Sequence, residues 1–330
     1  MAEFISTFVT GFQDVVEKDF PGRMPGAKII NVYDGLIHYK FDGNSRDLEK
    51  IIYFNNTFFV IKTFNQKNFN FSAMVNQVCT SKNYYLISKG SFRCRFSQEN
   101  QFVKVDRNLV KRAEENVLHN SRLTIDRVSP STEIWYSIRR EGFGFCGQLI
   151  SKREFTEKNL NKGELRPEIA YLIAGFANLS ERDVVADVFA GYGSIPVQIA
   201  KKFRFSYMYV SDISSQQYDI LRERKQLNAD NIQIEQSDAF ELSYIADKSV
   251  DVVITDPPWG YFEEIDDIPL FYEKMFTSFK RILKDEGRMV ILSARKTEIE
   301  ETCGKMNIKI KRSLHTLVNG KKASLYEMNF

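Results

Sequence analysis

The spacing of hydrophobic residues divides the chain into three stretches. In residues 1–65, runs that alternate hydrophobic and polar positions are interrupted by segments with the spacing of an amphipathic helix. The predicted elements are a strand over 4–9, a helix over 12–20, two strands within 28–41, a helix over 46–54 and a strand over 57–64. This β-α-β-β-α-β order predicts an α+β, ferredoxin-like unit.

The second stretch also mixes helices and strands. Its predicted elements are helices over 70–80 and 106–120, a strand over 91–96, and a hairpin of residues 133–140 and 143–150 around Glu141-Gly142. Residues 151–164 are polar and charged, which is typical of a linker.

From Leu165 onwards, strands and helices alternate regularly. Pro167 stands where a helix begins, a position that favours proline. Strands are predicted over 184–188, 207–212, 232–236, 250–255 and 288–292, which indicates an α/β, doubly wound parallel sheet. Asn319-Gly320 lies between two further runs and predicts a final antiparallel hairpin. We therefore predict domains over 1–66, 67–152 and 165–330, with a linker over 153–164.

Composition narrows the class of protein. The 330 residues are enough for two or three domains with separate cores. No apolar run approaches the length of a membrane span, and no basic region followed by an apolar one opens the chain. These features predict a cytoplasmic protein. The four cysteines lie far apart and only three histidines are present, so we predict neither a disulfide framework nor a metal site.

Positive charge is concentrated in the middle of the chain. Residues 61–160 contain 17 Lys and Arg against 9 Asp and Glu, whereas the whole chain has a net charge of +3. A basic segment between slightly acidic ones predicts a polyanion-binding module attached to a second function. An ordinary solvated surface is the alternative.

A glycine-containing loop follows the first strand of the third stretch. It reads D-V-F-A-G-Y-G-S-I from Asp187, and Gly191 and Gly193 allow a sharp turn and close approach of a ligand to the backbone. Asp212 ends the next strand, where a carboxylate can accept both hydroxyls of a ribose. The predicted cofactor-binding residues are Asp187, Phe189, Gly191, Gly193, Asp212, Ile213, Asp238, Ala239 and Asp256.

These residues distinguish between two adenosine-containing cofactors. NAD-binding proteins also place an acid after their second strand, but here Pro196 replaces the third glycine of the dinucleotide fingerprint. An acid after the third strand, Asp238, and the D-P-P-W sequence after the fourth add two further features. The combination fits S-adenosylmethionine better than NAD, and the final antiparallel hairpin is typical of a Class I methyltransferase.

The D-P-P-W sequence, residues 256–259, predicts methylation of an exocyclic amino group on a nucleobase. The lone pair of such a nitrogen is delocalised into the ring, so the nitrogen is a poor nucleophile. Asp256 and the carbonyl of Pro257 are placed to accept its two N–H groups, and Trp259 offers a face for stacking an extruded base. On this basis Trp259→Phe is expected to retain most activity. A proline turn with a packed tryptophan is the alternative.

With these motifs the chain resembles the THUMP-domain RNA methyltransferases. The catalytic part of the resemblance is carried by Leu165-Arg166-Pro167, by D-V-F-A-G-Y-G-S-I and by T-D-P-P-W-G. The THUMP part rests on a weaker pattern, F-R-C-R-F at 92–96 and the helix after Asp106. Relatives often have Tyr where this chain has Trp259, and either Asp or Asn heads their motif.

The resemblance implies an S-adenosylmethionine-dependent enzyme that methylates N2 of a guanosine in tRNA. It implies that the THUMP domain binds the acceptor region of tRNA, and a need for an activating protein stays open. From the basic segment we add candidate phosphate contacts, namely Arg93, Arg95, Arg107, Lys111 and Arg112. A fragment starting near Lys152 is expected to keep cofactor binding.

Three alternatives remain at this point. One is a guanine-N2 methyltransferase of large-subunit rRNA, and another is a DNA amino-methyltransferase, which shares D-P-P-W. The third is a non-enzymatic RNA-binding protein with a methyltransferase scaffold.

Overall fold

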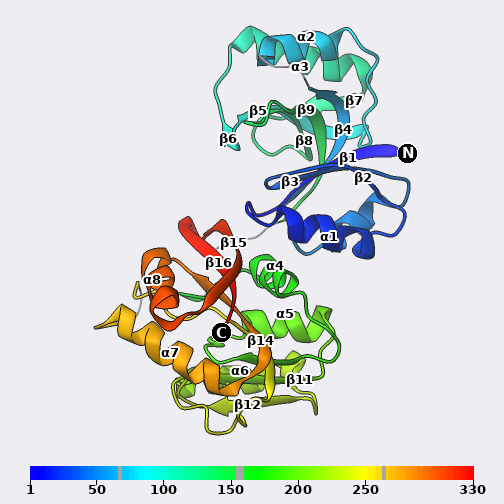
Figure 1. Ribbon diagram of the computed structural model, residues 1–330. Coiled ribbons are helices and arrows are strands. Elements are labelled where there is room, and N and C mark those ends of the chain that lie inside the picture. The colour runs from blue at the N-terminus through cyan, green and yellow to red at the C-terminus, as the bar shows by residue number, and fades with distance from the viewer. Residues whose placement is uncertain (66–68, 154–159, 262–264) are drawn as a thin grey trace. The chain divides into compact units, whose positions relative to one another are not determined.

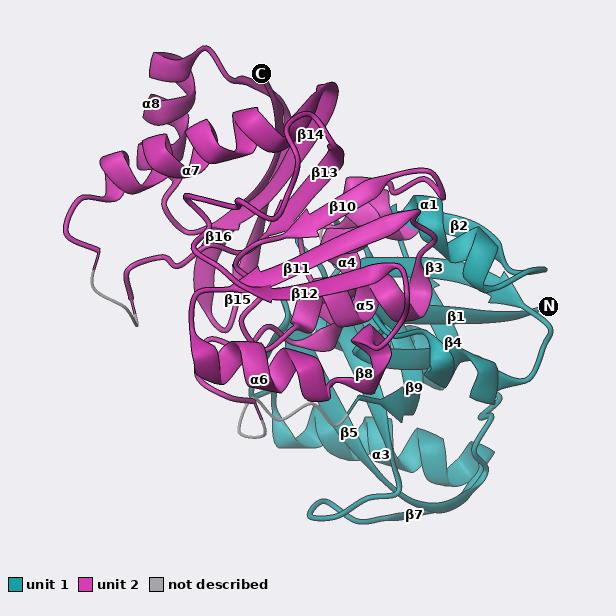
Figure 2. Cartoon of the chain, turned by 90° about the horizontal axis from the view of Figure 1, so that it is seen from below, with its two compact units in different colours: residues 1–8, 17–154 teal, residues 9–16, 155–330 magenta. Residues whose placement is uncertain are grey.

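The computed structural model describes residues 1–65, 69–153, 160–261 and 265–330. The chain forms two compact units, one of residues 1–8 and 17–154 and the other of residues 9–16 and 155–330 (Figure 2). The helix α1, Gln13–Arg23, is divided between them. Among the described residues, each helix is too short or too polar to span a bilayer.

The first four strands of the first unit have the predicted ferredoxin-like arrangement. They are β1 (Ala2–Thr7), β2 (Lys28–Tyr33), β3 (Leu36–Phe41) and β4 (Asn56–Phe64). They are neighbours in the order β2-β3-β1-β4, and each neighbouring pair is antiparallel. The predicted strands and the first helix are therefore confirmed.

The helix predicted over 46–54 is wrong. The structure has only a short 3-10 helix, η1 (Ser45–Lys50), which the side chain of Asn44 caps at the N–H of Arg46. At Ile51 the backbone becomes extended. A nine-residue segment is too short to be a stable α-helix by itself, so tertiary contacts decide the conformation here.

The rest of the first unit extends the same sheet. Its strands are β5 (Lys89–Gln98), β6 (Gln101–Phe102), β7 (Arg122–Ile125), β8 (Thr132–Ile138) and β9 (Gly144–Lys152). Within the described residues the order is β2-β3-β1-β4-β9-β8-β5-β6, and β7 pairs with β5. The helices α2 (Phe71–Cys79) and α3 (Arg107–Asn120) pack together beside these strands (Figure 1).

The predicted domain boundaries stay predictions. The boundary between 66 and 67 falls on residues 66–68, and much of the linker falls on residues 154–159, both outside the described residues. The antiparallel pairing of β4 with β9 places parts of both predicted N-terminal domains in one sheet.

The second unit contains the predicted seven-stranded sheet. Its strands are β10 (Val184–Asp187), β11 (Tyr207–Asp212), β12 (Ile232–Gln236), β13 (Val250–Thr255), β14 (Leu283–Ser293), β15 (Lys309–Val318) and β16 (Lys321–Asn329). Their order in the sheet is β12-β11-β10-β13-β14-β16-β15. The first five strands in this order are parallel to one another, and β16 is antiparallel to its neighbours β14 and β15. The α/β, Rossmann-like fold class with its antiparallel hairpin is confirmed.

Helices cover both faces of this sheet. They are α4 (Pro167–Ala177), α5 (Ser194–Lys202), α6 (Ser215–Glu223), η3 (Lys225–Leu227), α7 (Ile268–Ile282) and α8 (Lys296–Met306). Ala186 and Val253 lie in a buried cluster with α7 and α8, while the alternate residues Val185, Val252 and Ile254 are also fully buried. Burial of both faces explains why the strands read as continuous apolar runs. The sequence pattern did not indicate α8.

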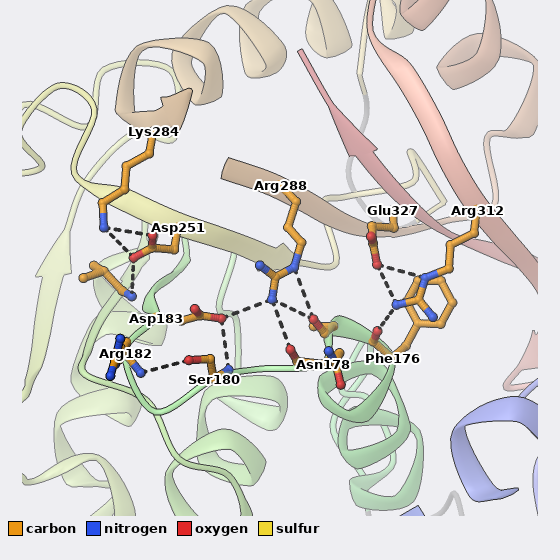
Figure 3. A network of polar contacts seen from close by, with 12 residues as sticks. Phe176, Asn178, Ser180, Arg182, Asp183, Asp251, Lys284, Arg288, Arg312 and Glu327 are labelled. Carbon is orange, nitrogen blue, oxygen red and sulfur yellow. Dashed lines mark hydrogen bonds and ion pairs between the residues drawn. The ribbon is translucent and has the colours of Figure 1, made fainter. Parts of the chain in front are cut away.

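Two sets of side-chain contacts lie where the parallel strands begin, one holding the end of α4 and the other joining neighbouring strands. Arg288 of β14 donates to the carbonyls of Ala177 and Asn178, at 2.9 and 3.3 Å, and to Asp183 at 3.1 Å (Figure 3). Asp251 of β13 accepts from Lys284 and from the N–H of Val184.

Candidate active site at the carboxyl edge of the sheet

Four predicted carboxylates follow the ends of four parallel strands. Asp187 ends β10, Asp212 ends β11, Asp238 follows β12 and Asp256 follows β13. The parallel register pairs Asp187 with Val210, Asp212 with Gln236, and Ala186 with Val253. The sheet therefore brings the four carboxylates to one edge, the usual ligand position in an open α/β sheet.

The loop between β10 and α5 contains two glycines with positive φ, which let the backbone turn sharply beside a ligand. Gly191 and Gly193 have φ of 52° and 81°, values that favour glycine. A Cβ on Gly193 would come within 2.9 Å of Leu221, whereas a Cβ on Gly191 would meet nothing within 4 Å. A side chain at Gly193 would require Leu221 to move, whereas Gly191 faces open space. Phe189 is half-buried, and its ring lies 5.8 Å from that of Phe271.

Asp212 joins two loops of the site. Its Oδ2 accepts the N–H of Gly191 at 2.8 Å, and its Oδ1 accepts the N–H of Ser214 at 3.0 Å. Each carboxylate oxygen retains a second lone pair for a ligand hydroxyl. Beside it, Ile213 is 64% exposed and offers an apolar surface for a planar ring. The sequence predicted the ribose contact but not this bracing of the glycine loop.

Asp187 is fully buried, and its chemistry depends on β13. The hydroxyl of Thr255 donates to its Oδ1 at 2.7 Å. Burial raises the pKa of Asp187 to about 7, against the opposing effect of the Thr255 hydrogen bond. Sequence reasoning did not select Thr255. Its position directly before Asp256, on the strand next to β10, is the signal that identifies it.

Asp238 and Ala239 follow β12 as predicted. Oδ1 of Asp238 accepts the N–H of Phe240 at 2.9 Å, which fixes the turn. Ala239 is buried in the core.

The D-P-P-W segment presents a carboxylate held by the neighbouring indole. Nε1 of Trp259 donates to Oδ1 of Asp256 at 2.9 Å, and no N–H or O–H group of the described residues donates to Oδ2. Burial raises the pKa of Asp256 well above its ordinary value; the Trp259 hydrogen bond opposes this, and the charge of Asp187 adds to it. Pro257 is buried, and Pro258 has no N–H to donate.

Two arginines that sequence reasoning missed fix the loops around the site. Nη2 of Arg224 donates to the carbonyl of Tyr192 at 3.0 Å and lies 3.6 Å from Glu164. Nε of Arg295 donates to the carbonyl of Trp259 at 2.6 Å. Both act through backbone carbonyls, which no side-chain motif reveals.

The candidate RNA contacts lie in the first unit, and they differ in whether a carboxylate of the protein already lies beside their positive charge. Arg93 forms an ion pair with Glu133, and Arg95 lies 3.6 Å from the same carboxylate. Arg95 also stacks on Phe102, with its guanidinium carbon 4.7 Å from the ring centre. Glu133 therefore neutralises part of the charge that the sequence assigned to RNA.

The other three candidates lie on α3 and are exposed. They are Arg107, Lys111 and Arg112, and Lys111 lies 3.7 Å from Glu115. Arg107 also borders a hollow of about 340 Å³, whose lining includes Arg95, Phe102 and Lys104. The hollow combines cations with an exposed aromatic ring.

The residues at the sheet edge fit the adenosine and the amino-acid end of S-adenosylmethionine. The open space beside Gly191 leaves room for a ligand against the loop. Asp212 has lone pairs for ribose hydroxyls, exposed Ile213 suits an adenine face, and Asp187 is an acceptor for an ammonium group.

Comparison with known proteins agrees with this fold. Residues 153–323 match the family model described as the RMKL-like methyltransferase domain. TrmN from Thermus thermophilus has a similar structure over 100% of this chain and 99% of its own, with a TM-score of 0.78 and 17% identity. At that identity the likeness shows the fold alone.

Two curated relatives match part of the chain. U6 snRNA (guanine-N(2))-methyltransferase THUMPD2 of Bos taurus is 32% identical over 133 residues, which are 39% of this chain and 25% of THUMPD2. Release factor glutamine methyltransferase of Rhodopirellula baltica is 31% identical over 147 residues, 40% of this chain and 49% of that protein. The chain thus spans half or less of these relatives. Because the family model covers more than half of the chain, the chain belongs to the RMKL-like methyltransferase domain family.

Proposed function

We propose that the protein is an S-adenosylmethionine-dependent RNA methyltransferase that modifies the exocyclic N2 amine of a guanosine in tRNA. The observation that carries the proposal is Asp256, a carboxylate at the sheet edge with Oδ1 held by Trp259. The same edge bears the glycine loop and Asp212. An acceptor for an amine therefore stands beside a place for the methyl donor.

The proposed chemistry begins with the orientation of the amine. Oδ2 of Asp256 and the carbonyl of Pro257 accept its two N–H groups, which turns the lone pair out of conjugation with the ring. Trp259 stacks on the base and keeps the carboxylate in place through its indole N–H. Bound S-adenosylmethionine supplies an electrophilic methyl group on a sulfonium. The chain's contribution is to hold the nitrogen in line with it.

The environment of Asp256 also suits it as the proton acceptor. A newly methylated, aniline-like cation is far more acidic than a carboxylic acid, so its proton passes readily to a carboxylate. Burial raises the pKa of Asp256, which makes its carboxylate a stronger base. A positive charge on the donor and on the product favours the ionised carboxylate while the reaction proceeds.

RNA is proposed as the substrate on three grounds. THUMPD2, the relative with 32% identity, is named for methylation of a guanine N2 in U6 snRNA. The exposed cations of α3 and the hollow at Phe102 are the proposed contacts for phosphates and bases. Both precede residues 153–323, which match the methyltransferase family. The sequence resemblance points to the acceptor region of tRNA. A cytoplasmic location and a tRNA rather than rRNA substrate are parts of this proposal.

A glutamine side-chain amide is the second candidate acceptor. The release factor methyltransferase of Rhodopirellula baltica is named for that substrate, and its match covers 40% of this chain. An amide nitrogen is a poor nucleophile for the same reason as a nucleobase amine. The acceptors therefore share the catalytic geometry and differ in the macromolecule that presents them.

The test is mass spectrometry of the methylated product. Purified protein and isotopically labelled S-adenosylmethionine are incubated with tRNA, rRNA, duplex DNA or release factor, and the digests are analysed. We expect labelled N2-methylguanosine from tRNA. Labelled N5-methylglutamine, or label in DNA alone, would overturn the proposal.

A matched variant links the product to the site. Asp256→Ala removes both carboxylate oxygens, so no side chain at this position can accept an N–H from the target amine. We expect kcat to fall by at least about a thousandfold while S-adenosylhomocysteine affinity changes less than about twofold, because the contact matters mainly in the transition state. Normal turnover by this variant would refute the assigned role.

A further inference from the structure

A cationic and aromatic cluster lies directly beyond the D-P-P-W segment. It consists of Tyr261, Arg295 and Lys321, which we call the Tyr261 cluster. The guanidinium carbon of Arg295 lies 5.0 Å from the centre of the Tyr261 ring, and Nζ of Lys321 lies 3.8 Å from the same centre. Tyr261 is 49% exposed, so the cluster reaches the surface.

Arg295 joins this cluster to the catalytic segment. Its Nε donates to the carbonyl of Trp259 at 2.6 Å, and its own N–H donates to the hydroxyl of Ser293 at 2.9 Å. Ser293 is buried and hydrogen-bonded to Tyr272. The rings of Trp259 and Tyr261 lie 6.3 Å apart with an edge-to-face inclination of 76°. The position of the Tyr261 cluster is therefore fixed relative to the ring on which the target base is proposed to stack.

Lys321 reaches the cluster from the C-terminal hairpin. It begins β16 after the turn at Asn319-Gly320, where φ is 49° and 78°. β16 is antiparallel to β14, and Ser324 pairs with Ser293. Lys321 is three residues before that pair and thus lies beyond the carboxyl end of β14, close to Arg295. The hairpin that completes the fold delivers a cation to the active site.

Two positive charges at one ring suit an anionic ligand. Attraction to the ring face offsets part of their mutual repulsion. Arg295 also forms a loose ion pair with Glu298, whose Oε1 is 3.6 Å from Nη1. A phosphodiester would accept from both cations, and charge-assisted hydrogen bonds to phosphate are among the strong ones.

We propose that Arg295 and Lys321, held on Tyr261, bind the phosphodiester next to the nucleotide whose base enters the Asp256 site. The inference rests on the proposed function, because it names the part of an RNA substrate that this surface takes. It assigns to the catalytic unit a phosphate contact separate from those of α3. Such a contact positions the strand and is independent of base identity.

The test uses Lys321→Gln, since Arg295 also holds the carbonyl of Trp259. The control is Lys322→Gln, the adjacent exposed lysine, whose side chain points to the other side of the strand. Full-length proteins loaded with S-adenosylhomocysteine are titrated with a fluorescent five-nucleotide RNA that has one central guanosine. In matched RNAs, each phosphodiester in turn is replaced by a neutral methylphosphonate.

For the wild type and Lys322→Gln, we expect one linkage beside the guanosine whose neutralisation weakens binding by about tenfold. For Lys321→Gln, the charged RNA should bind about tenfold more weakly, and neutralising that linkage should change binding by less than about twofold. The slope of log affinity against log salt should be smaller in magnitude by about one for Lys321→Gln.

The inference would be overturned if neutralising the same linkage still weakened binding by Lys321→Gln. It would also be overturned if the wild type did not bind the five-nucleotide RNA. Neither result depends on turnover. The product analysis by mass spectrometry decides the proposed function separately, so a phosphate contact can fail while guanosine methylation stands. Unchanged S-adenosylhomocysteine affinity in both variants shows that the fold is intact.

Discussion

At the scale of single residues, Trp259 combines two roles that its sequence motif does not separate. Its ring is available for stacking, and its Nε1 donates to Asp256 at 2.9 Å. The stacking role alone predicts that Trp259→Phe keeps most activity. Because the structure adds a hydrogen bond to a half-buried carboxylate, we now expect kcat to fall by about ten- to a hundredfold, the equivalent of about 1.5–3 kcal/mol.

The measurement is single-turnover methyl transfer to RNA, with Tyr261→Phe as the control because it keeps the neighbouring ring and removes only a hydroxyl. S-adenosylhomocysteine affinity should be the same in both variants. A Trp259→Phe enzyme as fast as the wild type would show that the indole N–H is dispensable.

Asp187 makes the stability of the cofactor-free protein depend on pH. Burial raises its pKa to about 7, so the folded chain retains a proton that the unfolded chain releases near pH 4. Between these values folding takes up a proton, and the free energy of unfolding therefore falls as pH rises toward 7. Asp187→Asn removes this contribution.

We expect the melting temperature of Asp187→Asn, relative to the wild type, to increase between pH 5 and pH 8. Thermal melts without cofactor at several pH values test this. In the same range, wild-type affinity for S-adenosylhomocysteine should weaken as pH falls below 7, because the proposed ammonium contact needs the ionised carboxylate. A constant difference in melting temperature would contradict the linkage.

At the scale of elements, Arg288 decides how α4 is attached to β14. It donates to the carbonyls of the last residue of α4 and of the residue that follows, and to Asp183, and its side chain is 25% exposed (Figure 3). Arg288→Met leaves those acceptors without their donor, so we expect a loss of about 2–3 kcal/mol of unfolding free energy. Urea unfolding monitored by circular dichroism measures it.

Arg204→Ala is the contrasting variant in the same unit. Arg204 lies 3.4 Å from Glu181, but the two side chains are 86% and 65% exposed. Exposed pairs contribute little, so this change should cost less than about 0.5 kcal/mol. Equal losses in the two variants would show that the Arg288 contacts are no more important than a surface ion pair.

At the scale of the whole molecule, the second unit is not continuous in sequence. Residues 9–16 belong to it, and the hydroxyl of Thr316 donates to the carbonyl of Thr10 at 2.8 Å. A fragment starting near Lys152 lacks this segment. We therefore expect it to bind S-adenosylhomocysteine but to melt at a lower temperature than the full chain.

Gly11 provides a sharper test of whether residues 9–16 stabilise the second unit. A Cβ there would lie 2.1 Å from the carbonyl oxygen of His315, and its φ is +91°. Gly163 has a similar φ of +85° with nothing within 4 Å of its Cβ position. Both substitutions to alanine incur backbone strain, but Gly11→Ala adds a steric clash and should cost about 1–3 kcal/mol more. Equal melting temperatures would show that the approach of Gly11 is unimportant for stability.

The sequence by itself determined the features that depend on local periodicity and on position along a strand. Buried strands of a parallel sheet read as apolar runs, and parallel strands bring their carboxyl ends to one edge. Those two facts place Asp187, Asp212, Asp238 and Asp256 together without coordinates. The turn at Asn319-Gly320 was equally local, because its positive φ values favour these residues.

Only the tertiary structure decided what each side chain contacts. Residues 46–54 have helical spacing, yet they form a short 3-10 helix and an extended segment. Arg93 and Arg95 remain predicted RNA contacts, but only the structure shows that Glu133, about forty positions away, lies beside them. The same holds for Thr255 on Asp187, for Arg295 on Trp259 and for Lys321 on Tyr261. These partners are distant in sequence, and chain folding alone brings them within hydrogen-bonding distance or ring contact.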